Sequence, residues 1–188
     1  MQELRVESSV DLLVDRARQG DRNAFGDLVR LHQHEVFTLA VRLVADRTVA
    51  ADVAQDAFIR AWRALPNFRG DAAFATWLHR ITVNAAWSQR RRAAARPVSQ
   101  LDEALTVPDT DPLRQPERVG EVADLRQALG DAIGALPIGM RAVVVLKDIY
   151  GWSHDDVARA LGISETAAKV RLHRAHLRLR EMLDGRHP

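Results

Sequence analysis

Cationic, hydroxyl and apolar side chains alternate with a helical period in the stretch SETAAKVRLHRAHLRLREML, which begins at Ser164. Drawn as a wheel at about 100° per residue, one side of this stretch is apolar. The opposite side and its flanks carry Thr166, Lys169, Val170, Arg171 and Arg174. Lysine and arginine can read guanine in a major groove, and an apolar side chain can contact a thymine methyl. These residue types therefore suit a helix that reads DNA.

The residues before this stretch predict the element that would position it. Ser153 followed by Asp156 resembles a capping box, Gly162 is placed to end a short helix, and Ser164 offers a second N-cap. A short helix, a glycine turn and a second helix are typical of a helix-turn-helix. An amphipathic surface helix in an ordinary bundle is the alternative, but the coincidence of caps, turn and basic face favours DNA binding.

A second cationic stretch lies near the middle of the chain. Between Trp77 and Arg96 there are five arginines and no acidic residue. The expected outer face of this helix consists of Thr76, Arg80, Val83, Trp87 and Arg91, with Asn84 beside them. An outward tryptophan among arginines suits nucleic acid, because bases stack on aromatic rings and phosphates pair with cations. The alternative is a Trp87 buried beneath a loop.

A narrow polar stripe marks the preceding helix, which starts at Asp46 or Thr48 and ends before Pro66. Its members are Asp52, Gln55, Asp56, Arg60 and Arg63. The rest of this helix is largely apolar, so we expect it to be embedded in its domain and to offer the stripe to a partner. A solvated face explains the pattern equally well.

Helical spacing accounts for the remaining segments, and the fold class we expect is all-α. Residues 1–8 lack a strong pattern and should be loose. Further helices are predicted over 9–18, from an Asn23 cap to about Val44, and from an Asp71 cap to Arg92. Two more are predicted over 119–136 and 138–150, and the apolar face of the first of these consists of Val122, Leu125, Leu129 and Ile133. Three valines at 143–145 are assigned to the last of these helices, because no second strand signal exists to pair with them.

Four prolines separate the chain into two small helical domains. Pro97, Pro108, Pro112 and Pro116 forbid a continuous helix. From Val98 to Asp124 seven acidic residues face two arginines. We therefore expect a domain over 9–93, a flexible acidic linker over 94–118 and a second domain over 119–184. The linker could occupy a cationic channel that nucleic acid would otherwise enter, or it could be a solvated tether.

Composition excludes several classes of function. The 188 residues contain 27 Lys and Arg against 25 Asp and Glu, a net charge of +2, and no cysteine, so neither disulfides nor thiolate metal sites can form. No apolar run resembles a signal peptide or a membrane span, so a soluble, cytoplasmic protein is expected. His32 and Glu35 share a face but His34 does not, so we expect no metal there. Without a phosphate loop or a Ser/His/Asp set, we expect no enzyme, cofactor or small-molecule substrate.

Two stretches resemble one family. DVAQDAFIRAWRALPNFRGDAAFATWLHRITVNAAW, from Asp52 to Trp87, resembles region 2 of bacterial sigma factors. ALPIGMRAVVVLKDIYGWSHDDVARALGISETAAKVRLHRA, from Ala135 to Ala175, resembles region 4. With only the acidic linker between them, the chain resembles the short extracytoplasmic-function (ECF) type. The resemblance implies a promoter-specificity subunit that binds core RNA polymerase through the β′ coiled coil and the β flap, and that binds promoter DNA. An anti-sigma partner is also expected.

The resemblance also implies roles for individual residues. The polar stripe matches the helix that binds the β′ coiled coil. Residues implied at the −10 element are Phe68, Arg69, Arg80, Asn84, Trp87 and Arg91, with Phe68 and the following loop holding an extruded base that Asn84 contacts. Those implied at the −35 element are Ser164, Thr166, Lys169, Val170, Arg171 and Arg174. Trp87 and Val170 depart from the commoner polar residues. A stand-alone helix-turn-helix repressor or activator is the main alternative, and it leaves the stretch from Asp52 to Trp87 unexplained.

Overall fold

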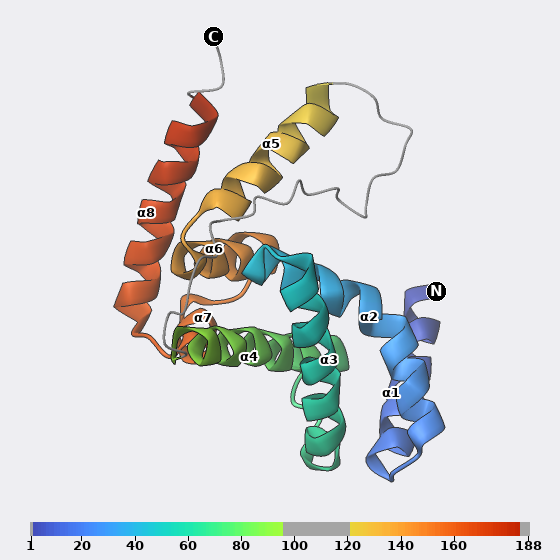
Figure 1. The fold of residues 1–188 in the computed structure, drawn as a ribbon. Coiled ribbons are helices and arrows are strands. Elements are labelled where there is room, and N and C mark those ends of the chain that lie inside the picture. The colour runs from blue at the N-terminus through green and yellow to red at the C-terminus, as the bar shows by residue number, and fades with distance from the viewer. Residues whose placement is uncertain (1, 96–120, 185–188) are drawn as a thin grey trace. The chain divides into compact units, whose positions relative to one another are not determined.

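The computed structural model describes residues 2–95 and 121–184, which belong to two compact units that divide between Ala95 and Arg96. Throughout these two ranges the regular elements are helices, as the sequence predicts (Figure 1). The predicted linker over 94–118 lies outside the described residues except for its first two, which end a helix. Within the described ranges, no helix combines the length and the apolar character that crossing a membrane requires.

The first unit is built around its second helix. Its elements are α1 (Gln2–Arg18), α2 (Arg22–Val44), α3 (Arg47–Ala64), the 3-10 turn η1 (Leu65–Asn67) and α4 (Phe74–Ala95). Helix α2 contacts α1, α3 and α4, and α3 also packs against α4. Because α1 begins at Gln2, the expectation that residues 1–8 are loose is wrong for residues 2–8.

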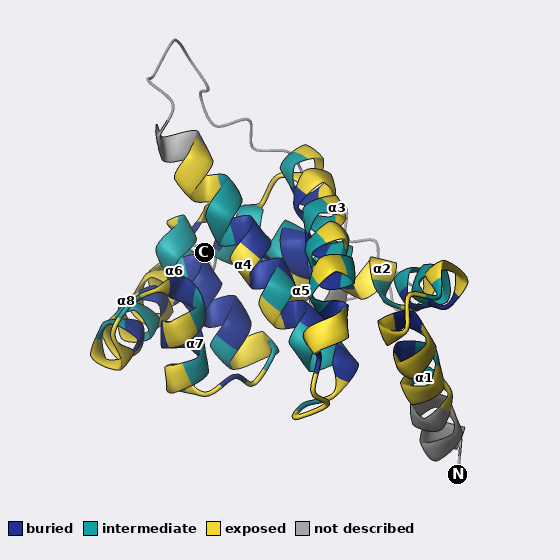
Figure 2. Ribbon diagram, turned by 90° about the horizontal axis from the view of Figure 1, so that it is seen from below, coloured by how far each residue is buried: buried dark blue, intermediate teal, exposed yellow. Residues whose placement is uncertain are grey.

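Small residues on α3 allow the helices of this unit to pack closely. Ala50, Ala57 and Ala61 are completely buried, and so are large side chains of the helices that α3 contacts, among them Leu39 of α2 and Leu78 of α4. Burying each leucine contributes about 1.5–3 kcal/mol relative to leaving it in water. Figure 2 shows these buried segments on the inner sides of the helices, with exposed residues on their outer sides. Packing therefore fixes which faces of α3 and α4 remain free.

Aspartates begin two helices of the first unit. The Asp21 carboxylate accepts hydrogen bonds from the backbone N–H groups of Asn23 (2.9 Å) and Ala24 (3.1 Å), so Asp21 is the N-cap of α2 and the prediction of Asn23 is wrong. Arg16 at the end of α1 holds the other carboxylate oxygen at 2.7 Å. Together, the bond from Ala24 and the Arg16 side chain lower the pKa of Asp21. Asp46 caps α3, one of the two starts predicted.

The loop before α4 is longer than the sequence indicates. Helix α4 begins at Phe74, so Asp71 lies in the loop and does not stand at the cap position next to the first helical residue. The predicted loop over 66–71 begins inside η1, and the loop extends to residue 73. The extra residues matter because this loop separates the polar stripe of α3 from the cationic helix α4.

The second unit places two supporting helices before a helix-turn-helix. Its elements are α5 (Glu121–Ala135), α6 (Ile138–Val144), the π-helical turn η2 (Val145–Ile149), α7 (His154–Leu161) and α8 (Glu165–Asp184). The three valines at 143–145 are helical, as predicted, and they are buried. Ala132 and Leu136 pack with Val144 of α6 and with Ala175 and Leu179 of α8.

Helix α5 does not bury the face that its sequence suggests. Leu125 and Leu129 are 60% and 41% exposed, so the predicted packed face is wrong for these two residues. The contacts come from the C-terminal end, where Ala132 and Leu136 are buried and the predicted Ile133 packs against them. There the buried guanidinium of Arg141 donates hydrogen bonds to the carbonyl oxygens of Gly134 (2.6 Å) and Leu136 (3.0 Å). Burial lowers the pKa of Arg141.

Candidate polymerase and nucleic-acid interfaces

The polar stripe lies along α3, but its members have different surroundings. Asp52, Gln55 and Arg63 are exposed, whereas Asp56 and Arg60 are half-buried. A half-buried charged side chain is usually satisfied by partners of its own domain. The stripe therefore divides into a free part and a part engaged within the unit.

Asp56 and Arg60 connect α3 to α4. Arg60 Nη2 lies 2.7 Å from Asp56 Oδ2, and Arg92 Nη2 of α4 lies 3.3 Å from the same oxygen. Arg60 Nη1 also donates a hydrogen bond of 3.3 Å to Ser88 Oγ. Ser88 Oγ in turn donates a bond of 2.7 Å to the carbonyl oxygen of Asn84. These bonds link the stripe to the turn of α4 that carries Asn84.

An exposed isoleucine stands in the middle of the free part of the stripe. Ile59 is 44% exposed. It follows Asp56 by three positions and precedes Arg63 by four, so it shares their face of the helix. Ile59 is not among the predicted stripe residues, because these were defined by their polarity. Its spacing of three and four positions from Asp56 and Arg63 is the sequence signal that places it in the stripe.

An aromatic cluster anchors the loop between η1 and α4. The Phe68 ring lies 4.9 Å from the Trp77 ring and 6.1 Å from the Phe74 ring, centroid to centroid, with the latter pair nearly perpendicular. Such pairs add about 0.5–1.5 kcal/mol beyond the area that they bury. Phe68 is only 9% exposed, because its aromatic neighbours cover most of its ring. It therefore fixes the loop that carries the exposed Arg69.

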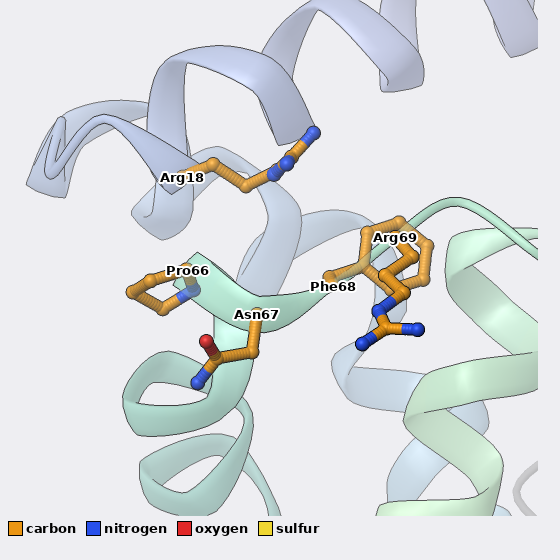
Figure 3. Close-up of a pocket in the computed structure, with 5 residues that line it drawn as sticks. All are labelled: Arg18, Pro66, Asn67, Phe68 and Arg69. Carbon is orange, nitrogen blue, oxygen red and sulfur yellow. The ribbon is translucent and has the colours of Figure 1, made fainter.

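A pocket of about 410 Å³ opens between the end of α1 and this loop. Its lining residues are Arg18, Pro66, Asn67, Phe68 and Arg69. Figure 3 shows the Arg18 side chain of α1 running alongside the loop, while the other four side chains belong to η1 and the residues after it. Phe68 and Arg69 are among the predicted site residues but Arg18 is not, because no local sequence signal indicates that the end of α1 meets this loop.

The outer face of α4 carries most of the residues implied for the −10 element. Arg80, Asn84 and Arg91 are exposed. Trp87 is half-buried, and the guanidinium of Arg90 lies 4.9 Å from its ring centroid, within the range of a cation–π interaction. Val83, which the helical wheel placed on this face, is completely buried, so that prediction is wrong.

Two histidines and a glutamate tie α4 to α2 behind this face. His79 Nε2 of α4 lies 3.0 Å from Glu35 Oε1, and His32 Nδ1 lies 3.6 Å from Glu35 Oε2. His32 and His79 hold the pKa of Glu35 well below its usual range. His32 and Glu35 are neighbours on one face, as predicted. Among the described residues, no group of three or more His, Asp or Glu side chains is arranged to hold a metal ion.

The helix-turn-helix forms as the sequence predicts. Ser153 Oγ accepts a hydrogen bond of 3.0 Å from the N–H of Asp156 and begins α7. Gly162 ends α7 with a φ of 65°, in the left-handed region that glycine adopts without strain. Ser164 Oγ then accepts a bond of 3.1 Å from the N–H of Ala167 and begins α8.

The outward face of α8 is mixed apolar and cationic. Thr166, Lys169 and Arg174 are exposed, and Val170 is 42% exposed. Lys169 Nζ lies 2.7 Å from Glu165 Oε1, and this bond lowers the pKa of Glu165. Opposite this face, α8 buries three residues of its predicted apolar side, Ala168, Ala175 and Leu179.

Two further residues of α8 contact the supporting helices. Arg171 is half-buried, and its guanidinium lies close to Gly139 of α6. A Cβ atom built on this glycine would be 3.5 Å from Nη1 of Arg171. His176 Nε2 lies 2.7 Å from Asp148 Oδ2 of η2. Arg171 is therefore less available to DNA than the helical wheel indicates. The link between His176 and Asp148 depends on the π-helical turn, which the sequence analysis did not predict.

Comparisons with known proteins agree with this architecture. The sequence matches the family described as Sigma-70 region 2 over residues 28–96 and the family described as Sigma-70, region 4 over residues 126–179. It is 36% identical to the RNA polymerase sigma-H factor of Pseudomonas aeruginosa over 181 residues, covering 92% of this chain and 90% of that protein. It is 35% identical to the ECF RNA polymerase sigma-E factor of Escherichia coli K12, covering 93% and 92%. The fold is similar to that of CnrH in complex with the cytosolic domain of CnrY, with a TM-score of 0.59, 30% identity and coverage of 95% and 99% of the two chains.

These matches, with one helical unit for each matched region, show that the chain belongs to the sigma-70 family of RNA polymerase sigma factors. The chain is a sigma factor of the ECF type, as its resemblance to regions 2 and 4 implied. Sigma factors are DNA-binding proteins of transcription initiation, and this one directs RNA polymerase to specific promoters.

Proposed function

We propose that the two units divide the work of promoter recognition, with a domain over 9–93 binding polymerase and the −10 element and a domain over 119–184 binding the −35 element. The proposed linker over 94–118 joins them. The observation that carries this proposal is that each unit presents an exposed cationic helix face, α4 in the first and α8 in the second. Neither face is covered by its own unit, so both are available to DNA.

The polymerase-binding surface in this proposal is the free part of the α3 stripe together with Ile59. Asp52, Gln55 and Arg63 form its polar rim, and Ile59 is its apolar centre. Interfaces commonly concentrate their binding energy in a central apolar anchor that polar residues surround. The other two stripe residues, Asp56 and Arg60, form the contacts with α4 described above. The expected partner is the β′ coiled coil of core RNA polymerase.

The DNA-binding surfaces in this proposal lie on α4 with its preceding loop and on α8. Asn84 contacts an extruded base of the −10 element, while Arg69, Arg80 and Arg91 pair with backbone phosphates. Trp87 presents the exposed part of its ring to an unpaired base. At the −35 element, the contacts come from Ser164, Thr166, Lys169, Val170 and Arg174, with Arg171 a peripheral contact.

The remaining parts of the proposal concern partners and place of action. The second unit would bind the β flap of the polymerase, and an anti-sigma factor would hold the protein inactive. The structural relative CnrH was determined with the cytosolic domain of CnrY, a precedent for a protein partner of such a factor. We further propose that the protein acts in the cytoplasm, has no catalytic activity of its own and needs no cofactor.

Reconstituted transcription tests this proposal. The purified protein is added to core polymerase, and specific initiation is measured on a promoter library. Initiation with core, combined with weak duplex binding without core, is the expected result. Tight and specific duplex binding by the isolated chain would instead indicate a stand-alone repressor or activator. Asn84→Ala should impair promoter opening and leave core binding intact, whereas lost core binding would show that Asn84 has been assigned to the wrong surface.

A further inference from the structure

Ser88 lies at the centre of a polar network that joins α3 to α4. Its Oγ accepts a hydrogen bond of 3.3 Å from Arg60 Nη1 and donates one of 2.7 Å to the carbonyl oxygen of Asn84. The carbonyl oxygen of Ser88 accepts a bond of 3.5 Å from Arg92 Nε. Both arginines also pair with Asp56 Oδ2. We call Asp56, Arg60, Ser88 and Arg92 the Ser88 network, and it connects the α3 stripe with the turn that carries Asn84.

Apolar packing holds this part of α4 less firmly than the part before it. The earlier turns bury three large side chains, those of Phe74, Leu78 and Val83. Within residues 84–92 the buried side chains are those of Ala85 and Ala86. A methyl group removes less apolar area from water than a larger side chain, so it contributes less to stability. The position of this segment therefore depends more strongly on polar contacts such as those of Ser88.

Solvent weakens the Ser88 network in the free protein. The side chains of Asp56 and Arg60 are each 34% exposed, and that of Arg92 is 61% exposed. Water and salt screen such pairs, so they contribute little to stability. A partner that covers them excludes water, and the pairs strengthen as the local dielectric constant falls. Covering leaves no unpaired charge on Asp56, because its carboxylate already has two guanidinium partners.

A protein bound on the α3 stripe would cover part of this network. Asp52 precedes Asp56 by four positions and Arg63 follows Arg60 by three, so these four residues share one face of the helix. The exposed Ile59 lies among them. A partner that contacts Asp52, Ile59 and Arg63 must therefore lie over the exposed parts of Asp56 and Arg60.

We infer that Ser88 is a positioning residue, through which a polymerase bound at α3 stabilises the turn of α4 that carries Asn84. This inference rests on the proposed function, because it takes the stripe as the polymerase surface and Asn84 as a contact to the −10 element. Coupling between two binding sites is reciprocal, so −10 DNA strengthens polymerase binding by the same factor. Ser88 acts through Arg60 on one side and through the Asn84 carbonyl on the other.

The test measures the dissociation constant of the full-length protein for core polymerase, with and without a saturating single strand that carries the −10 element of a promoter selected from the library. The ratio of the two constants is the coupling factor. Ser88→Ala should lower this factor about fivefold, the effect of one ordinary hydrogen bond, and should change core binding without DNA by less than about twofold. Contacts between the strand and core are common to all variants, so they cancel when coupling factors are compared.

Two further variants separate the Ser88 hydroxyl from a general effect on α4. Ser88→Thr keeps the hydroxyl and should restore the coupling factor. Thr82→Val is the matched control, because Thr82 Oγ1 donates a bond of 2.9 Å to the carbonyl oxygen of Leu78, four positions earlier in the same helix, as Ser88 does to that of Asn84. Its loss should lower Tm and leave the coupling factor unchanged. Alanine is a good helix former, so Ser88→Ala is expected to fold.

A double-mutant cycle tests the route through Arg60. Because Ser88→Ala and Arg60→Ala remove the same hydrogen bond, the double variant should have the coupling factor of Arg60→Ala alone. Effects of the two substitutions that multiply would show that Ser88 does not act through Arg60, and this would overturn the inference.

Three other results would also overturn it. These are a wild-type coupling factor in Ser88→Ala, equal weakening of core binding by Ser88→Ala with and without DNA, and a coupling factor in Ser88→Thr as low as in Ser88→Ala. Failure of the proposed function is a different result and is recognised in the wild type alone. In that case the unaltered protein does not bind core, or its complex with core does not bind the −10 strand.

Discussion

Truncating Ile59 should weaken binding to core polymerase more than truncating any comparable exposed residue of the first unit. Ile59 is 44% exposed in the free protein. For a residue of about 180 Å², this leaves roughly 80 Å² to be buried by a partner, which at 25 cal/mol per Å² corresponds to about 2 kcal/mol. Alanine would retain part of this contact. We therefore expect Ile59→Ala to cost about 1–1.5 kcal/mol of binding free energy, close to a tenfold rise in Kd.

The assay is equilibrium binding of the labelled full-length protein to core polymerase, with thermal unfolding measured in parallel. Leu31→Ala is the control, because Leu31 is 55% exposed on α2, away from the stripe. Ile59→Asp should weaken binding further, since it places an unpaired charge at the centre of the interface. If Ile59→Ala binds core as tightly as Leu31→Ala does, the apolar centre of the proposed surface is refuted. A binding loss that tracks a lowered Tm would refute it as well.

Three further predictions concern other parts of the molecule. Val170→Ser should reduce the preference for thymine at one position of the −35 element by about 1 kcal/mol, measured by binding of the holoenzyme to a set of single-base variants; an unchanged preference would remove Val170 from the base-reading set. Asp21→Ala should lower the denaturant midpoint of unfolding of the first unit, measured by denaturant titration, because it removes both the cap of α2 and the link to α1; an unchanged midpoint would contradict this. At pH values above about 4.5, where the wild-type carboxylate is ionised in folded and unfolded chains alike, Glu35→Gln should have a lower Tm than the wild type. Because the pKa of Glu35 is lowered in the folded protein, the stability that the wild-type carboxylate contributes is lost as the pH falls below 4.5. Solvent screening of this half-exposed carboxylate limits its contribution to about 1 kcal/mol. A difference in Tm that stays constant from pH 6 to pH 3 would contradict this reasoning.

Local signals in the sequence predicted most of the helices and several of their ends. Ser153, Gly162 and Ser164 define the helix-turn-helix through contacts within three or four positions of each residue, so no distant part of the chain is needed to identify them. Local signals could not decide which residue caps α2, because Asp21 and Asn23 are both good N-cap residues. The structure favours Asp21, since Arg16 at the end of α1 lies against its carboxylate.

The candidate surfaces were less completely predictable. The residues of the stripe and of the outer faces of α4 and α8 follow from helical periodicity, and most of them are at least partly exposed. The side chains that surround them were not predictable. Phe68 is taken up by an aromatic cluster, and Arg18 reaches the pocket from another helix.

The amino-acid sequence by itself determined that this protein is helical, where its caps and breaks fall, which segments carry positive charge and which family it belongs to. These properties depend on residue type and on neighbours within about one helical turn, or on motifs that can be compared directly. Only the tertiary structure decided which of two plausible faces each helix buries. It turned Val83 inward, left Leu125 in solvent and tied Arg60 to Ser88, because such outcomes depend on shape and hydrogen-bonding partners contributed by distant parts of the chain.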